Sequence, residues 1–386
     1  MTYVPHPIRA WGSPSRYIQG PGLLSSLETY TNVYGRRVAA IIDQFFFDEL
    51  TNELAQSFEN TGSKITTTIF NSEVTLAKIE ETTEAVRAFA PDVIVGIGGG
   101  KTLDMAKAVA DNFCAPVVIC PTSASTDAPT SALSVIYKES GEHSHARNYV
   151  SNPNLVLMDS TIIANAPIRF LVSGMGDALA TIFEATANDL ADHGNYINEK
   201  QGPFRRPKTA MIVAQACYDT LMEFGVRAKL AAELGLVTEA VENIIECNTL
   251  MSGLGFENTG CAGAHSVGDG ITGLPEGAKS LHGERVAFGT ICQLVAEGAD
   301  TAVIEEVVHF CLDVGLPVTL ADLWVEKTPE NLEVIANTSM HSFWNAEPFN
   351  INKQQIIDAI LAGDAIGAYY KNGREAVKGA ALDNPV

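Results

Sequence analysis

Short apolar runs alternate with helix-like segments along the first 160 residues of the chain. The apolar runs are rich in Val, Ile and Leu, end at turn-forming residues, and therefore favour buried strands. Six such runs predict strands at residues 38–42, 65–70, 93–97, 116–120, 132–137 and 155–158. Helical patterns lie between several of them, including residues 47–58 and 76–89. Alternation of this kind predicts a mostly parallel sheet with helices on its faces.

From about residue 161 onward the pattern changes to one helix after another. The pattern predicts helices at residues 176–190, 209–224, 228–234, 237–251, 285–297 and 304–314. The sequence predicts turns between these helices at Gly225, Gly235 and Gly315. We therefore predict an α/β N-terminal domain with a mostly parallel, Rossmann-like sheet over residues 1–162, and an all-α domain over residues 163–386. The active site is expected in the cleft between the two.

A cluster of glycines directly follows the predicted strand at 93–97. Gly98, Gly99 and Gly100 precede a helical pattern that begins at Thr102. Bare backbone N–H groups and a helix N-terminus meet there, which suits a phosphate or pyrophosphate. The loop has Lys101 where a dinucleotide-binding Gly-x-Gly-x-x-Gly would need glycine, and Val95 where a Walker A loop would need it. The alternative is a glycine-rich turn without a ligand.

Composition and charge narrow the class of protein. At 386 residues the chain suits two domains, and its net charge of −21 argues against a nucleic-acid partner. We find no apolar run of the roughly 20 residues that a membrane span needs, and no secretion signal, so we expect no membrane partner and a cytoplasmic location. The seven cysteines form no Cys-x-x-Cys pair and read as buried free thiols.

Asp43 ends the predicted strand at 38–42. A carboxylate at the end of a strand beside a glycine loop can accept hydrogen bonds from a ribose diol and repel a 2′-phosphate. This position therefore favours NAD over NADP. The alternative is an N-cap for the following helix, a common role of Asp.

A hydroxyl-rich loop, residues 121–131, follows the predicted strand at 116–120 and surrounds the single carboxylate of Asp127. Because ligands of parallel sheets bind beyond the carboxyl ends of the strands, these groups are candidates for binding a cofactor and a polyol. Composition alone favours a solvent-exposed loop.

Three residues in the second half are candidate metal ligands. Asp177 lies at the start of a predicted helix, His265 lies in a helix of small residues, and His282 lies just before another helix. One carboxylate and two imidazoles make a three-ligand site with an open position, as in catalytic metal centres. The spacing does not establish that they converge. Considered alone, Asp177 is typical of a helix N-cap. A lone histidine is typically a polar residue whose hydrogen bonds are made to its neighbours. His143 and His145 read as surface residues of a charged loop.

Several blocks together resemble a known family. Residues 96–107, 121–137, 174–181, 253–257 and 282–289 are similar, in this order, to the glycerol dehydrogenases of the metal-dependent, iron-containing-type alcohol dehydrogenase family. The resemblance implies NAD-dependent oxidation of glycerol and related vicinal diols to dihydroxyacetone. It also implies one Zn²⁺ held by Asp177, His265 and His282, and a homo-oligomer.

The same resemblance implies the remaining site residues. Asp127 would hold the substrate hydroxyls, and Asp43 the adenosine ribose. The rest of the NAD site would comprise Gly98, Gly99, Gly100, Lys101, Thr102, Asp104, Thr122, Ser125, Ser131, Leu133 and Tyr137. No side chain stands out as a general base.

Other functions remain open on this scaffold. It also resembles glycerol-1-phosphate dehydrogenase and dehydroquinate synthase, whose charged substrates need cationic residues in the pocket. Lys279 and Arg285 are the nearest cations to the candidate blocks, which favours a neutral polyol. A dehydrogenase of another small polyol or hydroxy acid, and a non-catalytic NAD-binding protein, are the alternatives.

Overall fold

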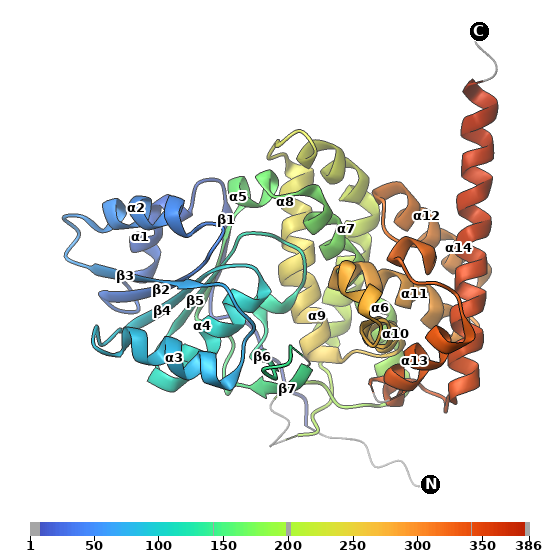
Figure 1. Cartoon of the computed structure of the whole chain (residues 1–386), viewed down its shortest axis with the longest axis horizontal. Coiled ribbons are helices and arrows are strands. Elements are labelled where there is room, and N and C mark those ends of the chain that lie inside the picture. Colours follow the sequence, from blue (N-terminus) through green and yellow to red (C-terminus); the bar gives the residue numbers. More distant parts are fainter. Residues whose placement is uncertain (1–7, 142, 198–201, 341, 383–386) are drawn as a thin grey trace. The chain divides into compact units, whose positions relative to one another are not determined.

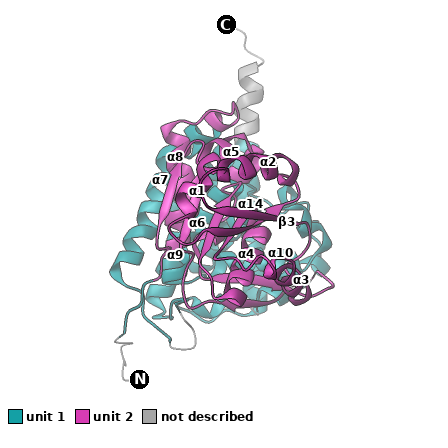
Figure 2. Ribbon diagram, turned by 90° about the vertical axis from the view of Figure 1, so that its left-hand side faces the viewer, with its two compact units in different colours: residues 1–11, 172–229, 255–386 teal, residues 12–171, 230–254 magenta. Residues whose placement is uncertain are grey.

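The computed structural model describes residues 8–141, 143–197, 202–340 and 342–382. The chain divides into two compact units, coloured separately in Figure 2. We call residues 12–171 and 230–254 the sheet unit, and residues 1–11, 172–229 and 255–386 the helical unit. Within the described residues, no helix is both long enough and apolar enough to cross a bilayer.

The sheet unit contains a six-stranded, entirely parallel sheet in the order β1-β8-β5-β4-β2-β3. The strands are β1 (Tyr17–Gly20), β2 (Arg37–Asp43), β3 (Lys64–Phe70), β4 (Val93–Gly98), β5 (Val117–Pro121) and β8 (Leu155–Asp159). The predicted fold class is confirmed, and five of the six predicted strands lie in this sheet. Sequence reasoning missed β1, whose four residues are only partly buried and carry no apolar run.

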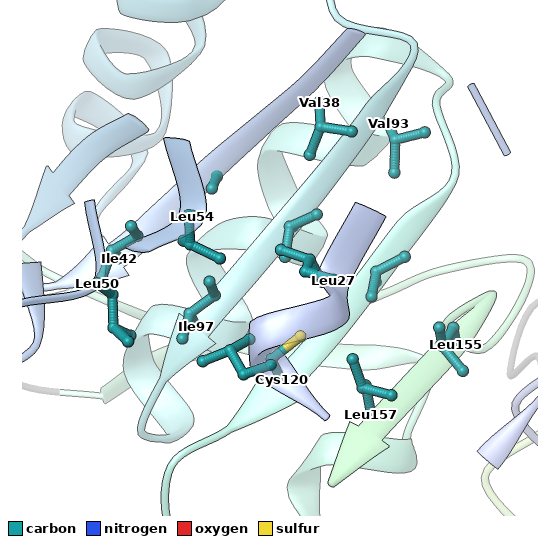
Figure 3. Packing of buried hydrophobic residues seen from close by; sticks show 14 of the residues in the cluster. Leu27, Val38, Ile42, Leu50, Leu54, Val93, Ile97, Cys120, Leu155 and Leu157 are labelled. Atoms are coloured by element: carbon teal, nitrogen blue, oxygen red, sulfur yellow. The ribbon is translucent and has the colours of Figure 1, made fainter. Parts of the chain in front are cut away.

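Helices cover both faces of the sheet (Figure 1). They are α1 (Leu27–Thr31), α2 (Phe47–Phe58), α3 (Leu76–Arg87), α4 (Gly100–Phe113) and α5 (Ser160–Asn165). Alternate strand residues such as Val38 and Ile42 pack with Leu27 and Leu54 in one apolar cluster (Figure 3). On the opposite face, a Cβ at Gly96 would lie 2.6 Å from the Cβ of Ala106. Glycine at position 96 therefore allows α4 to pack closely on β4.

The predicted strand at 132–137 lies outside the main sheet. It forms β6 (Leu133–Tyr137), which pairs antiparallel with β7 (His143–Asn148). The charged loop predicted around His143 and His145 is thus a strand, although His145 is exposed as expected. The ribbon is fixed to α4, because Asp104 Oδ2 accepts a 2.9 Å hydrogen bond from the backbone N–H of Val135.

The elements that follow β8 in the described part of the chain are helices. The longer ones are α6 (Ile168–Leu190), α7 (Lys208–Ala232), α8 (Glu239–Glu246), α9 (Ser252–Thr259), α10 (Gly263–Thr272), α11 (His282–Glu297), α12 (Thr301–Val314), α13 (Pro329–Ser339) and α14 (Lys353–Leu382). A π-helical turn, Cys247–Met251, joins α8 to α9. Helix α8 lies in the sheet unit, where it packs against β1 and α5. The division predicted after residue 162 stays a prediction.

Helices α7 and α6 differ most from the sequence prediction. Helices α11 and α12 each begin three residues before their predicted starts, so His282 is the first residue of α11 rather than the residue before a helix. Gly225 does not end a helix, because α7 runs through it. A Cβ there would lie 2.7 Å from the ring of Phe310, so this glycine serves the packing of α7 against α12. Helix α6 begins at Ile168, well before the predicted start at Gly176.

Candidate functional site

The helical unit brings the three predicted metal ligands together. Asp177 comes from α6, His265 from α10 and His282 from the first position of α11. Asp177 Oδ1 lies 3.4 Å from Nε2 of His265 and 3.2 Å from Nε2 of His282. Ligands about 2.1 Å from a tetrahedral metal are separated by about 3.4 Å. The spacing of these atoms therefore fits a shared cation.

Glycines beside the ligands allow the helices to meet. A Cβ at Gly283, next to His282, would lie 1.8 Å from the carbonyl oxygen of Ser173. A Cβ at Gly176, next to Asp177, would lie 2.3 Å from the carbonyl oxygen of Gly283. Any larger residue would push α6 and α11 apart at the point where their ligands converge.

The surroundings of these ligands favour positive charge. Burial alone would raise the pKa of Asp177, but His282 and His265 outweigh burial and hold the pKa below its usual range. Burial likewise disfavours a charged His265, yet Cys261, Glu184 and Asp177 raise its pKa well above the usual value. A pocket that stabilises an imidazolium also suits a metal cation.

Sequence reasoning missed Glu184, whose carboxylate lies 2.7 Å from Nδ1 of His265. Glu184 follows Asp177 by seven residues, or two turns, on α6. Two acidic residues at this spacing on a mainly apolar helix were the available signal. The N-cap interpretation of Asp177 is wrong, since Asp177 lies inside α6.

In the sheet unit, the glycine loop connects β4 to α4. Gly98 has φ +156°, and a Cβ there would lie 2.8 Å from the Cβ of Asp43. A Cβ at Gly99 or Gly100 would meet nothing within 4 Å, so the backbone of the loop faces open space. The N-terminus of the 14-residue helix α4 begins at Gly100. This arrangement suits an anionic ligand.

Asp43 lies beside this loop, as predicted, because β2 pairs with β4. Its Oδ2 accepts a 3.2 Å hydrogen bond from Thr102 Oγ1, and its Oδ1 accepts one of 2.9 Å from the backbone N–H of Phe45. Asp43 therefore also stabilises the turn before α2. The N-cap position of α2 is Phe46, and no side-chain hydrogen bond caps this helix, so Asp43 is not its N-cap.

Strand β5 brings Thr122 to the other side of the loop, where its N–H donates to Gly98 O at 3.0 Å. Ser125 follows in the same partly buried connection. Lys101 pairs with Glu73, and its ammonium lies 5.6 Å from the ring centroid of Tyr137.

Three other predicted NAD residues have internal contacts. Asp104 is buried against the β6–β7 ribbon, and burial raises its pKa to about 6 despite nearby Lys107. The buried Ser131 hydroxyl donates to Ala128 O, and Leu133 O accepts from Lys107 Nζ. These contacts fasten the ribbon to α4, and a role in cofactor binding stays a prediction.

Asp127 is buried, contrary to the solvent-exposed loop that composition favours. Its Oδ2 accepts a 2.8 Å hydrogen bond from Ser252 Oγ, a partner that sequence reasoning missed. A Cβ at Gly253 would lie 1.9 Å from Thr130 Oγ1 and 2.8 Å from Asp127 O. The glycine at 253 thus allows the start of α9 to lie against the Asp127 loop.

Comparisons with known proteins identify the family of the chain. Residues 14–160 match the sequence family described as "Iron-containing alcohol dehydrogenase". A glycerol dehydrogenase from Thermotoga maritima is 42% identical over 372 residues, covering 93% of this chain and 98% of that protein. A glycolaldehyde reductase from Halobacterium salinarum is 39% identical, covering 92% and 97%. The crystal structure of a probable glycerol dehydrogenase from Sinorhizobium meliloti is 42% identical with a TM-score of 0.87, covering 94% and 99%.

Proposed function

Because the chain belongs to the iron-containing alcohol dehydrogenase family, we propose that it oxidises glycerol and related vicinal diols to the ketone, dihydroxyacetone in the case of glycerol, with NAD as cofactor. The observation that carries this proposal is the convergence of Asp177, His265 and His282 on one point in the helical unit.

Asp177, His265 and His282 would hold one Zn²⁺. The donor set fits, because one carboxylate and two imidazoles leave a coordination position for a substrate oxygen. Zn²⁺ would act as a Lewis acid that lowers the pKa of a substrate hydroxyl. The buried Asp177 carboxylate contributes the negative charge that keeps a cation in this pocket.

The glycine loop would bind the pyrophosphate of NAD through its backbone N–H groups and the N-terminus of α4. Asp43 would accept hydrogen bonds from the adenosine ribose and disfavour NADP. NAD would supply the hydride acceptor. The other proposed contacts are Gly98, Gly99, Gly100, Lys101, Thr102, Asp104, Thr122, Ser125, Ser131, Leu133 and Tyr137.

Asp127 would accept hydrogen bonds from the substrate hydroxyls that do not react. Its hydrogen bond with Ser252 orients the carboxylate, and burial strengthens any hydrogen bond that it makes to a polyol. The location of the active site in a cleft, the cytoplasmic location and the homo-oligomer stay predictions.

A second substrate deserves a test because of the glycolaldehyde reductase from Halobacterium salinarum. The same groups would serve reduction of a two-carbon hydroxyaldehyde by NADH, since hydride transfer is reversible. Both activities place one hydroxyl beside the reacting carbon.

The experiment is a substrate panel that follows NADH absorbance. Glycerol, 1,2-propanediol and ethylene glycol are oxidised with NAD, and glycolaldehyde and dihydroxyacetone are reduced with NADH, each with and without a chelator. We expect the largest kcat/KM for the glycerol–dihydroxyacetone pair, and its loss with the chelator. A larger value for glycolaldehyde would favour the second function, and no turnover of any compound would indicate a non-catalytic NAD-binding protein.

A further inference from the structure

Glu184 makes an unusually complete set of contacts beside His265. Its side chain is only 1% exposed. Oε2 lies 2.7 Å from His265 Nδ1, while Oε1 accepts hydrogen bonds from the backbone N–H groups of Ala262 at 2.8 Å and His265 at 2.9 Å. One carboxylate therefore holds both the first turn of α10 and the imidazole that this turn carries.

We propose that Glu184 is a positioning residue that orients His265 and fixes its tautomer for metal binding; the inference rests on the function proposed above. A carboxylate oxygen accepts hydrogen bonds, so the 2.7 Å contact with Oε2 places a proton on Nδ1 of His265. A metal would then displace only the Nε2 proton and take the lone pair of that nitrogen, on the side where Asp177 Oδ1 lies 3.4 Å away. A carboxylate behind the imidazole also increases the basicity of the ligand nitrogen.

The alternative role for the Glu184 carboxylate is direct metal ligation. Glu184, Cys261 and His265 also offer ligand atoms within 4.8 Å of one another, so they could form a metal site of their own. The positioning role fits the contacts better. Both Glu184 oxygens already accept hydrogen bonds, and Nδ1 of His265 is engaged with one of them.

Glu184→Gln tests the inference with little change of shape. The amide keeps an oxygen for the two backbone N–H groups but presents an N–H₂ donor to Nδ1. His265 would then place its proton on Nε2, which blocks metal binding until the tautomer or the amide changes. Loss of such a partner typically weakens metal affinity by about 10- to 100-fold. We expect that loss for Zn²⁺, measured in the full-length protein by competition with a chromophoric chelator.

Glu347→Gln is the matched control. Glu347 Oε1 also accepts a backbone N–H at the start of α10, from Gly263 at 2.9 Å, but no hydrogen bond joins it to His265 among the described residues. Burial, together with Glu297, raises the pKa of Glu347 to about 8, so Gln mimics its neutral form at pH 7. We expect wild-type Zn²⁺ affinity in this variant.

Three further measurements decide the outcome. In a His265→Ala background, Glu184→Gln should weaken Zn²⁺ affinity no further, and thermal unfolding of the metal-free proteins should show that each variant folds. Co²⁺-loaded wild type should lack the near-ultraviolet charge-transfer band of a thiolate ligand. Equal Zn²⁺ affinity in wild type and Glu184→Gln, an undiminished effect in the His265→Ala background, or a thiolate band would overturn this inference alone. A wild-type protein that binds no Zn²⁺ would overturn the proposed function as well.

Discussion

The glycine loop of the sheet unit and the histidine centre of the helical unit (Asp177, His265 and His282) are candidate binding sites that are built in two different ways. The loop is contiguous in sequence and offers mainly backbone N–H groups, exposed because Gly99 and Gly100 lack side chains. The centre gathers Asp177, His265 and His282 from three helices and offers side chains that are supported by buried partners. Ligand binding by the loop should therefore tolerate substitutions of neighbouring side chains. Metal binding by the centre should instead depend on each of its three ligands and on the packing of the helices that carry them.

The largest expected effect is loss of a ligand from the histidine centre. His282→Ala leaves two protein ligands, so Zn²⁺ affinity should fall by more than about 100-fold, because changes behind a ligand already cost about 10- to 100-fold. Metal content after gel filtration measures this, with His309→Ala on α12 as the control. Stoichiometric zinc in His282→Ala, with normal turnover, would remove His282 from the centre.

The next effect concerns Asp127, which we assign to the substrate. Losing a hydrogen bond to a charged group costs roughly 1.5–3 kcal/mol, or about 10- to 150-fold in kcat/KM at about 1.4 kcal/mol per tenfold change. Asp127→Asn should show such a loss with glycerol and 1,2-propanediol, and a much smaller one with a mono-alcohol. Equal losses on diols and mono-alcohols, together with a lower melting temperature, would indicate a structural role instead.

How much the sequence predicts differs between the two regions for a physical reason. The strands, the loop and the position of Asp43 follow from local patterns, because apolar runs and glycines act on their immediate neighbours. Convergence of the three ligands depends on close helix crossings at Gly176 and Gly283, which no spacing rule contains. Glu184 and Ser252 were missed for the same reason, since their partners lie 81 and 125 residues away in sequence.

Local patterns also misled where tertiary packing decides the outcome. Gly225 predicts a turn, yet α7 continues through it because the ring of Phe310 needs the space. Residues 132–137 have the composition of a strand of the main sheet, but in the part of the chain that the structure describes they pair with β7 instead. A single sequence does not reveal which partner a strand or a glycine meets.

A third prediction tests the helix crossing itself. In Gly283→Ala the new methyl group would lie 1.8 Å from a backbone oxygen of α6, which cannot rotate away. Overpacking of this kind costs about 1–3 kcal/mol, so the melting temperature and the Zn²⁺ affinity should both fall. Gly373→Ala in α14 is the control, because a Cβ there meets nothing within 4 Å. If Gly283→Ala matched this control in both measurements, the close packing of α6 against α11 would not be needed for metal binding at the histidine centre.

The smallest effect is expected at the edge of the loop. Asp43→Ser removes a carboxylate that would face the 2′-phosphate of NADP, while the loop backbone stays. The preference for NAD over NADP, measured as the ratio of kcat/KM values, should narrow by about tenfold, the lower end of the range for one charged hydrogen bond. An unchanged ratio would mean that Asp43 does not select the cofactor and serves only its contacts with Phe45 and Thr102.

Anomalous diffraction from crystals of the zinc-loaded protein, recorded on both sides of the zinc absorption edge, tests the central claim most directly. We predict one strong peak about 2.0–2.2 Å from Asp177 Oδ1, His265 Nε2 and His282 Nε2. No peak at these three atoms, or a peak bonded to Cys261 and Glu184 instead, would contradict the account.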